Sequence, residues 1–131
     1  MAIEGACHCG AVRWTFASVP ESATSCSCTV CRRYGALWAY GFKDEGIRAS
    51  GTTRAYLRSP ETIEFRFCPG CGCVAYWCTT EPGEDGRHYM GVNLRMAEPS
   101  AVAAIPVQRF DGLDKPDEPP RDGGCVADSW F

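Results

Sequence analysis

The chain has 131 residues, the length of a single domain, and a formal net charge of -3 from 13 basic and 16 acidic side chains. It has no basic run that would follow a phosphate backbone, and no apolar segment approaches the roughly 20 residues of a membrane helix, so neither nucleic acid nor a membrane is expected as a partner. The N-terminus lacks the charged and apolar regions of a signal peptide, which predicts a cytoplasmic protein.

Most of the chain has the pattern of short strands separated by turn residues. Residues 11–17 alternate large apolar and polar side chains, which is typical of a half-buried strand. Further strands are predicted at 36–42, 52–59, 62–67, 74–80, 88–94 and 105–110, with a turn at Ser59-Pro60. Helix is predicted only near 29–35 and 98–104, so the expected fold class is all-β with little helix.

The composition changes at Asp111. Residues 111–131 are acidic and rich in Pro and Gly, which predicts an extended or mobile tail after a domain that spans 1–110. Trp130 and Phe131 end this tail. They are expected either to fray or to dock on the body or on a second subunit, so an oligomer is compatible with the sequence.

Ten cysteines are the strongest chemical signal in the chain. In a reducing cytoplasm, closely spaced cysteines indicate a metal site rather than disulfides. Eight of them form three clusters with the spacings C-x-C, C-x-C-x-x-C and C-x-x-C-x-C: Cys7 and Cys9; Cys26, Cys28 and Cys31; Cys68, Cys71 and Cys73. Zinc is the expected ion, because it binds thiolates in a tetrahedron.

The segment FCPGCGC has the form of a zinc knuckle, in which Cys68 and Cys71 supply half of a tetrahedral site. The C-x-C pair near the N-terminus can supply the other half, which leaves the central cluster with three ligands. A closed set of four ligands is typical of a structural site, and three ligands with an open position are typical of a catalytic one. Spacing alone leaves other divisions open, because the knuckle can equally pair with two of the central cysteines.

The motifs GACHCGAV, CSCTVCRRYG and FCPGCG, in this order, resemble those of the glutathione-dependent formaldehyde-activating enzyme family, which also includes centromere protein V-like proteins. The resemblance covers about residues 3–110. It implies a tent-like arrangement of antiparallel sheets and two zinc ions per chain. The implied structural zinc ligands are Cys7, Cys9, Cys68 and Cys71. The implied catalytic zinc ligands are Cys26, Cys28 and Cys31, with the fourth position open.

The chemistry of a three-thiolate site agrees with this resemblance. Three thiolates give a zinc centre a net charge of about -1, so it acidifies water less than a zinc ion held by neutral histidines. A thiol that binds such a zinc ion is deprotonated and stays nucleophilic. The family reaction adds glutathione to formaldehyde and gives S-hydroxymethylglutathione. We therefore predict a carbon–sulfur lyase-type enzyme whose partner is a small-molecule thiol, with glutathione as the leading case.

Two other functions fit the same residues. A non-catalytic, zinc-stabilised binding module is known among the centromere protein V-like members, although this chain lacks basic low-complexity extensions. A thiol redox sensor would use the exposed thiolates of an open site. Family members that act on glutathione are generally longer than this chain, so the resemblance carries over the metal sites more firmly than the thiol.

Several residues near the clusters have two interpretations. Cys73, Cys78 or a histidine can close the central site, although cysteines in strands are usually small buried side chains. His8 is expected to point away from the metal. Arg32 and Arg33 either offset the negative site and bind a carboxylate or form a solvated pair.

The remaining expectations concern aromatic and terminal residues. The run Trp38, Tyr40 and Phe42 is expected in the core. Cys125 is expected to be an exposed thiol. The sequence leaves the roles of Cys73, Cys78 and Cys125 open.

Overall fold

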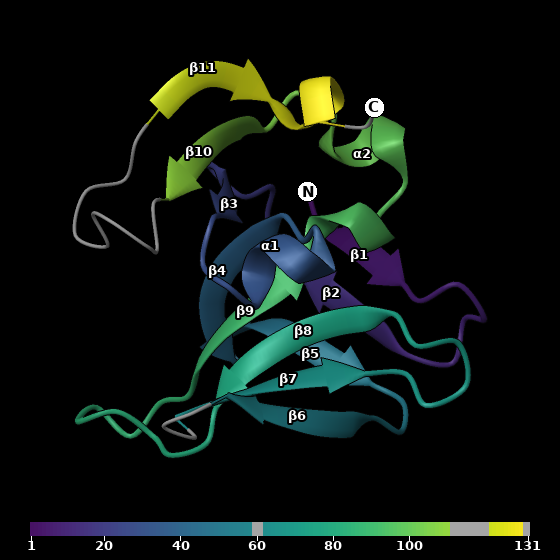
Figure 1. Cartoon of the computed structure of the whole chain (residues 1–131), viewed down its shortest axis with the longest axis vertical. Helices are drawn as coiled ribbons and strands as arrows, with labels where there is room; N and C mark the ends of the chain where they lie inside the picture. Colours follow the sequence, from purple (N-terminus) through teal and green to yellow (C-terminus); the bar gives the residue numbers. More distant parts are fainter. Residues whose placement is uncertain (59–61, 111–120, 130–131) are drawn as a thin grey trace.

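The computed structural model describes residues 1–58, 62–110 and 121–129 (Figure 1). The described residues form eleven strands of one curved sheet, two α-helices of four residues each and two short 3-10 helices. The strands are β1 (Ile3–Ala6), β2 (Arg13–Phe16), β3 (Ala23–Cys26), β4 (Trp38–Lys43), β5 (Gly46–Ser50), β6 (Arg54–Arg58), β7 (Ile63–Phe67), β8 (Val74–Thr79), β9 (Tyr89–Asn93), β10 (Pro106–Phe110) and β11 (Arg121–Cys125). The helices are α1 (Cys31–Tyr34), η1 (Leu94–Met96), α2 (Pro99–Val102) and η2 (Val126–Ser129).

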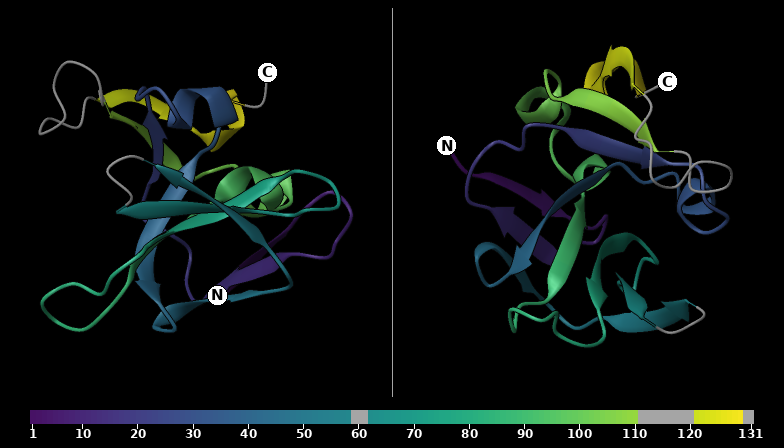
Figure 2. Two further views of the ribbon diagram at one scale, coloured as in Figure 1. Left: turned by 60° about the horizontal axis from the view of Figure 1, so that its bottom comes forward. Right: turned by 90° about the vertical axis from the view of Figure 1, so that its left-hand side faces the viewer.

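The sheet follows the order β1-β2-β5-β4-β9-β8-β7-β6, and β3, β10 and β11 branch from it next to β4. The branch lies at one end of the molecule, and the hairpins of β6, β7 and β8 lie at the other (Figure 2). The pairs are mainly antiparallel, as expected for a small β domain. Two pairs are parallel, β4 with β5 and β3 with β10, which departs from a purely antiparallel arrangement.

The expectation of an all-β fold with little helix is confirmed. The predicted strands correspond to β2, β4, β6, β7, β8, β9 and β10, and the two predicted helical segments correspond to α1 and α2. The sequence pattern did not predict β1, β3, β5 and β11. These strands have four or five residues each and lack a clear alternation, so their pairing with neighbours decides their conformation. The predicted turn at Ser59-Pro60 lies outside the described residues.

Residues 121–129 pack on the body of the domain, within the segment 111–131 that the sequence predicts to be an extended or mobile tail. Strand β11 pairs antiparallel with β10, and the Val126 side chain is 0% exposed within the main core. The Val126 backbone N–H donates to Ile105 O at 2.8 Å. Strand pairing with β10 and the burial of Val126 together hold this segment on the body. Residues 111–120, Trp130 and Phe131 lie outside the described residues.

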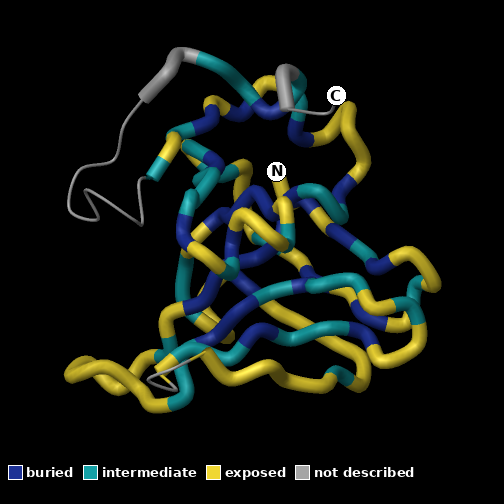
Figure 3. Tube along the Cα trace, viewed as in Figure 1, coloured by how far each residue is buried: buried dark blue, intermediate teal, exposed yellow. Residues whose placement is uncertain are grey.

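The core divides into three apolar clusters that follow the curvature of the sheet. The largest lies under β2, β4 and β9 and contains Trp14, Ile47, Met90 and Leu94, each at most 1% exposed. The other two include the cysteine clusters themselves. Figure 3 shows the buried path of the central strands, in contrast to β6, whose five residues are all exposed. Apart from Cys9, which is exposed, the cysteines of the two sets are therefore packed into the body of the domain.

Candidate metal centres

The first cysteine cluster joins the segment after β1 to the connection between β7 and β8. The Sγ atoms of Cys7, Cys9, Cys68 and Cys71 all lie within 4.8 Å of one another. Cys7 and Cys9 follow β1, and the other two precede β8. The Sγ of Cys9 is 3.6 Å from both the Cys7 Sγ and the Cys68 Sγ. We call these four residues the closed cluster.

Two similar turns bring these sulfurs together. In the first turn, the Gly10 N–H donates to Cys7 O at 2.9 Å, and in the second the Gly72 N–H donates to Cys68 O at 2.8 Å. Both glycines have positive φ, +82° and +81°, a conformation that side chains with a Cβ rarely adopt. Each glycine directly follows the second cysteine of its motif. The local sequence therefore shapes each half of the cluster before the halves meet.

The donor set of the closed cluster fits zinc. A tetrahedral site with zinc–sulfur bonds of roughly 2.3 Å places its sulfurs about 3.8 Å apart, close to the observed spacings. Backbone N–H groups also point at the sulfurs: Val12 N donates to the Cys7 Sγ at 3.2 Å, and Gly70 N donates to the Cys68 Sγ at 3.4 Å. Such bonds stabilise thiolates and orient them toward a metal ion.

The second cluster lies where β3 leads into α1. The Sγ atoms of Cys26, Cys28 and Cys31 lie within 4.8 Å of one another. Cys26 ends β3, Cys31 begins α1, and the Cys31 N–H donates to the Cys28 Sγ at 3.4 Å. Strand β10 supports this segment, because Cys26 pairs with Phe110 and the Ser27 N–H donates to Phe110 O at 2.9 Å. We call these three residues the open cluster.

Within the described residues, no fourth Cys, His, Asp or Glu joins the open cluster. Cys78, one of the residues expected to close it, donates its Sγ–H to Thr79 O at 3.4 Å instead. The His88 Nδ1 lies 2.9 Å from the same carbonyl oxygen. Cys73 follows the knuckle and packs against the apolar cluster that contains Cys7 and Cys68, so it lies beside the closed cluster. The donors of the open cluster are thiolates that suit zinc, but they fill only three positions of a tetrahedron.

The thiols of the open cluster share protons unequally. A hydrogen bond from the Cys31 side chain lowers the pKa of Cys26 to about 6, against the effect of burial, and the Arg58 charge lowers it further. The same hydrogen bond and burial raise the pKa of Cys31. The cluster therefore has thiolate character at neutral pH, as a metal ligand requires.

A pocket of about 290 Å³ adjoins the open cluster. Its other lining residues come from five strands that are distant in sequence: Trp38, Tyr40, Arg58, Ile63, Phe65, Trp77 and Phe110. Cross-strand register explains the grouping, because Phe65 pairs with Trp77, Trp77 with Gly91, and Gly91 with Tyr40. Directly paired residues present their side chains on the same face of a sheet.

The wall of this pocket is mainly aromatic. Tyr40 and Trp77 line it, and both contact each other and Tyr89, which lies outside the lining, with ring centroids 5.4–5.7 Å apart. Tyr34 of α1 packs on Phe65 with a centroid separation of 5.2 Å, which holds the helix against the sheet. The expectation of core positions holds for Trp38, which is 0% exposed, but is wrong for Tyr40, which is 37% exposed at the pocket.

The arginine beside the open cluster is Arg58, and not Arg32 or Arg33 as expected. Arg32 is exposed. The Arg33 Nη1 donates to Thr29 O at 2.8 Å, so the Arg33 side chain contacts the loop just before α1. Neither lines the pocket, whereas Arg58 of β6 does. Sequence reasoning missed Arg58, because only the β6–β7 register places it opposite Ile63 on the pocket face.

The other singled-out residues have structural surroundings. His8 is exposed between Cys7 and Cys9, and Cys78 is buried at 6% exposure, as expected for a cysteine in a strand. Cys125 is half-buried rather than exposed, because β11 pairs with β10. All ten cysteines lie within the described part of the chain, and none of them forms a disulfide bond there.

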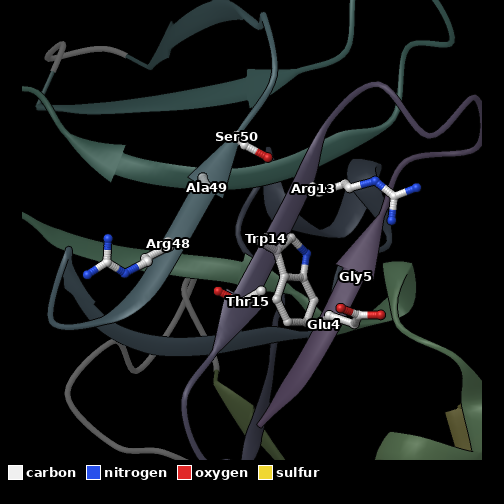
Figure 4. Close-up of a pocket in the computed structure, with 8 residues that line it drawn as sticks. All are labelled: Glu4, Gly5, Arg13, Trp14, Thr15, Arg48, Ala49 and Ser50. Carbon is white, nitrogen blue, oxygen red and sulfur yellow. The ribbon is translucent and has the colours of Figure 1, made fainter.

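A second hollow of about 190 Å³ lies on the outer side of β1, β2 and β5 (Figure 4). It is lined by Glu4, Gly5, Arg13, Trp14, Thr15, Arg48, Ala49 and Ser50, a set without cysteine. Figure 4 shows Arg13 and Arg48 extending away from each other. The two cysteine clusters and this hollow are therefore separate features.

Comparison with known proteins agrees with the cysteine pattern. Residues 2–104 match the family described as glutathione-dependent formaldehyde-activating enzyme. The fold is similar to the crystal structure of a Rhodobacter sphaeroides protein, with a TM-score of 0.59 and 24% sequence identity over 80% of this chain and 99% of that chain. No curated protein matches the chain. In the described residues, no helix has the length and apolar character needed to cross a membrane. Because the family match spans most of the chain, this protein belongs to the glutathione-dependent formaldehyde-activating enzyme family.

Proposed function

We propose that the protein is a zinc-dependent carbon–sulfur lyase-type enzyme that acts on the adduct of a thiol and an aldehyde. The adduct of glutathione and formaldehyde, S-hydroxymethylglutathione, is the reference case that the family description suggests. The observation that carries the proposal is the open cluster, in which three thiolates adjoin a pocket and no fourth described ligand completes the set. A zinc ion bound there would keep a substrate thiol deprotonated and nucleophilic.

The two clusters have different roles in this proposal. Cys7, Cys9, Cys68 and Cys71 hold a structural zinc, because four converging sulfurs leave no position for substrate. Cys26, Cys28 and Cys31 hold the catalytic zinc, so the chain binds two zinc ions. Ten cysteines that form no disulfide bond in the described residues support a reducing, cytoplasmic location for such a protein.

The bond changes of the reaction balance without a redox partner. In the synthetic direction, the sulfur electron pair forms a bond to the carbonyl carbon, and the π electrons of the carbonyl group move to oxygen. The thiol proton ends on that oxygen. In the reverse direction, the carbon–sulfur bond breaks and releases aldehyde and thiol. The substrate sulfur is the nucleophile, so the protein needs no nucleophile of its own.

The pocket residues support these steps. Burial raises the pKa of Tyr40, so its phenol stays protonated at neutral pH and can donate a hydrogen bond to the adduct oxygen. The aromatic wall limits water at the reacting atoms. The short spacing from Cys26 to α1 keeps the three sulfurs on one side of the pocket.

The proposal is tested by replacing zinc with cobalt in the full chain and adding reduced glutathione. Thiolate-to-cobalt absorption bands report how many sulfurs bind each metal. Growth of these bands on addition of glutathione, with a loss of the response in Cys28→Ser, is the expected result. Cys78→Ser is the matched control, because Cys78 belongs to neither cluster. If no thiol changes the spectrum, the open cluster is not a thiol site, and a binding module becomes the better interpretation.

A further inference from the structure

The lining of the pocket beside the open cluster restricts the class of thiol substrate further than the family description does. We propose that it accepts a thiol with an apolar, preferably aromatic, body and a single anionic group, which Arg58 binds. This inference rests on the proposed function, because it names the class of thiol that the same site takes.

The lining of the pocket is mainly apolar. Apart from the three cysteines, six of the seven lining residues are aromatic or aliphatic: Trp38, Tyr40, Ile63, Phe65, Trp77 and Phe110. Glutathione would bring two carboxylates, an ammonium group and two amides into these surroundings. Buried polar groups without partners cost binding free energy, whereas an apolar body gains it. The lining therefore favours an apolar thiol.

The aromatic rings beside the pocket are held in fixed positions by their neighbours. Trp77 is only 7% exposed and contacts both Tyr40 and Tyr89 in edge geometry. Gly91 leaves room for the indole, because a Cβ there would collide with the Trp77 Nε1 and lie 2.7 Å from its Cε2. The indole is thus held in place before any ligand arrives. A rigid aromatic surface binds an aromatic body without paying to order its own side chains.

Arg58 is the cationic residue in the lining of this pocket. Two other arginines on neighbouring strands and loops are already neutralised: Arg66 pairs with Glu64 at 2.8 Å, and Arg87 pairs with Asp85 at 2.8 Å. Among the described residues, Arg58 forms no ion pair, yet it lines the pocket. A guanidinium group matches a carboxylate in shape and charge. One cation in the lining fits one anionic group on the ligand.

Trp38 adds an independent observation. It lines the pocket, and its Nε1 is buried without a hydrogen-bond partner in the described part of the chain. A buried donor of this kind is usually paired in a native protein. An oxygen atom of a bound thiol adduct would supply the partner.

The test compares thiols that separate the two features. The cobalt-loaded full chain is titrated with 2-mercapto-3-phenylpropanoate, 3-mercaptopropanoate, phenylmethanethiol and reduced glutathione, and the charge-transfer bands report binding. The compound with both features is expected to bind about tenfold more tightly than 3-mercaptopropanoate or glutathione, because it gains the aromatic contact. Arg58→Gln is expected to weaken binding of the two mercaptocarboxylates about tenfold and to leave phenylmethanethiol unchanged.

Matched variants control for general effects on the sheet. Arg54→Gln removes a charge from the same exposed strand outside the pocket and is expected to change no affinity. Trp77→Leu is expected to weaken the aromatic thiols and to leave 3-mercaptopropanoate unchanged. Equal affinities for all compounds, with no effect of Arg58→Gln, would overturn this inference but leave the proposed function standing. A spectrum that responds to no thiol would overturn the proposed function itself.

Discussion

Trp77 lies against the bare backbone of Gly91, its direct partner across β8 and β9. The indole occupies the space that a side chain at residue 91 would fill. Trp77 therefore covers β9 and reaches Tyr40 on β4, which makes a continuous aromatic wall beside the open cluster. The contact links one glycine on a central strand to the shape of the candidate active site.

Gly91→Ala is expected to destabilise the fold by about 2 kcal/mol, because the new methyl group overpacks a filled space. Denaturant unfolding measures this loss. Gly83→Ala is the control, because its Cβ would come no closer than 3.4 Å to another group. A Gly91→Ala protein as stable as Gly83→Ala would show that Trp77 can move without cost. Partial recovery by adding Trp77→Phe would confirm that the indole is the obstacle.

Asn93 connects the segments that follow the two cysteine clusters. Its Nδ2 donates to Val74 O at 2.9 Å, and its Oδ1 accepts from Leu37 N at 3.4 Å and Arg95 N at 3.1 Å. Asn93→Ala leaves these buried groups without partners and is expected to cost about 3 kcal/mol of unfolding free energy. Thermal and denaturant unfolding provide the measurement.

The same variant has a second expected effect. Because Val74 follows the knuckle and Leu37 follows α1, a chelator should remove metal faster from both clusters of Asn93→Ala than from the wild type. Thr52→Ala, which shortens an exposed polar side chain, should change neither stability nor metal release. An effect of Asn93→Ala on stability alone would show that the hydrogen bonds do not order the clusters.

The two clusters are expected to respond differently to loss of a ligand. Cys68→Ser should prevent folding, because structural zinc contributes about 10 kcal/mol or more to the folded state. Cys28→Ser should lose one zinc ion per chain and keep its fold. Metal analysis and circular dichroism on both purified variants test this difference. A well-folded Cys68→Ser protein, or an unfolded Cys28→Ser protein, would reverse the assignment of the clusters.

Val126 is expected to stabilise the body of the domain although it follows the acidic stretch. Val126→Ala should cost about 2 kcal/mol, because the side chain is 0% exposed in the main core. Val19→Ala is the control, because Val19 is 47% exposed and should change stability by less than about 0.5 kcal/mol. Equal unfolding midpoints for the two variants would show that the segment after residue 120 contributes nothing to the fold.

The sequence by itself determined the features that depend on short spacing. The C-x-C and C-x-x-C turns aim neighbouring sulfurs at one point, since Gly10 and Gly72 permit the required backbone conformation. The alternation in 62–67 likewise placed Ile63, Phe65 and Phe67 on one face of a strand. These are local properties, and a chain with this sequence adopts them wherever the segments lie.

Only the tertiary structure decided which clusters meet and what surrounds them. The closed cluster joins residues 59 positions apart, and several pairings satisfied the spacing equally. The pocket arises from the register of β4, β9, β8, β7 and β6, which brings Arg58 and Trp77 to one face. Strand register depends on contacts along the whole sheet, so a local pattern does not reveal it. The return of Val126 to the core follows the same principle, because its burial depends on β10 and not on the polar residues before it.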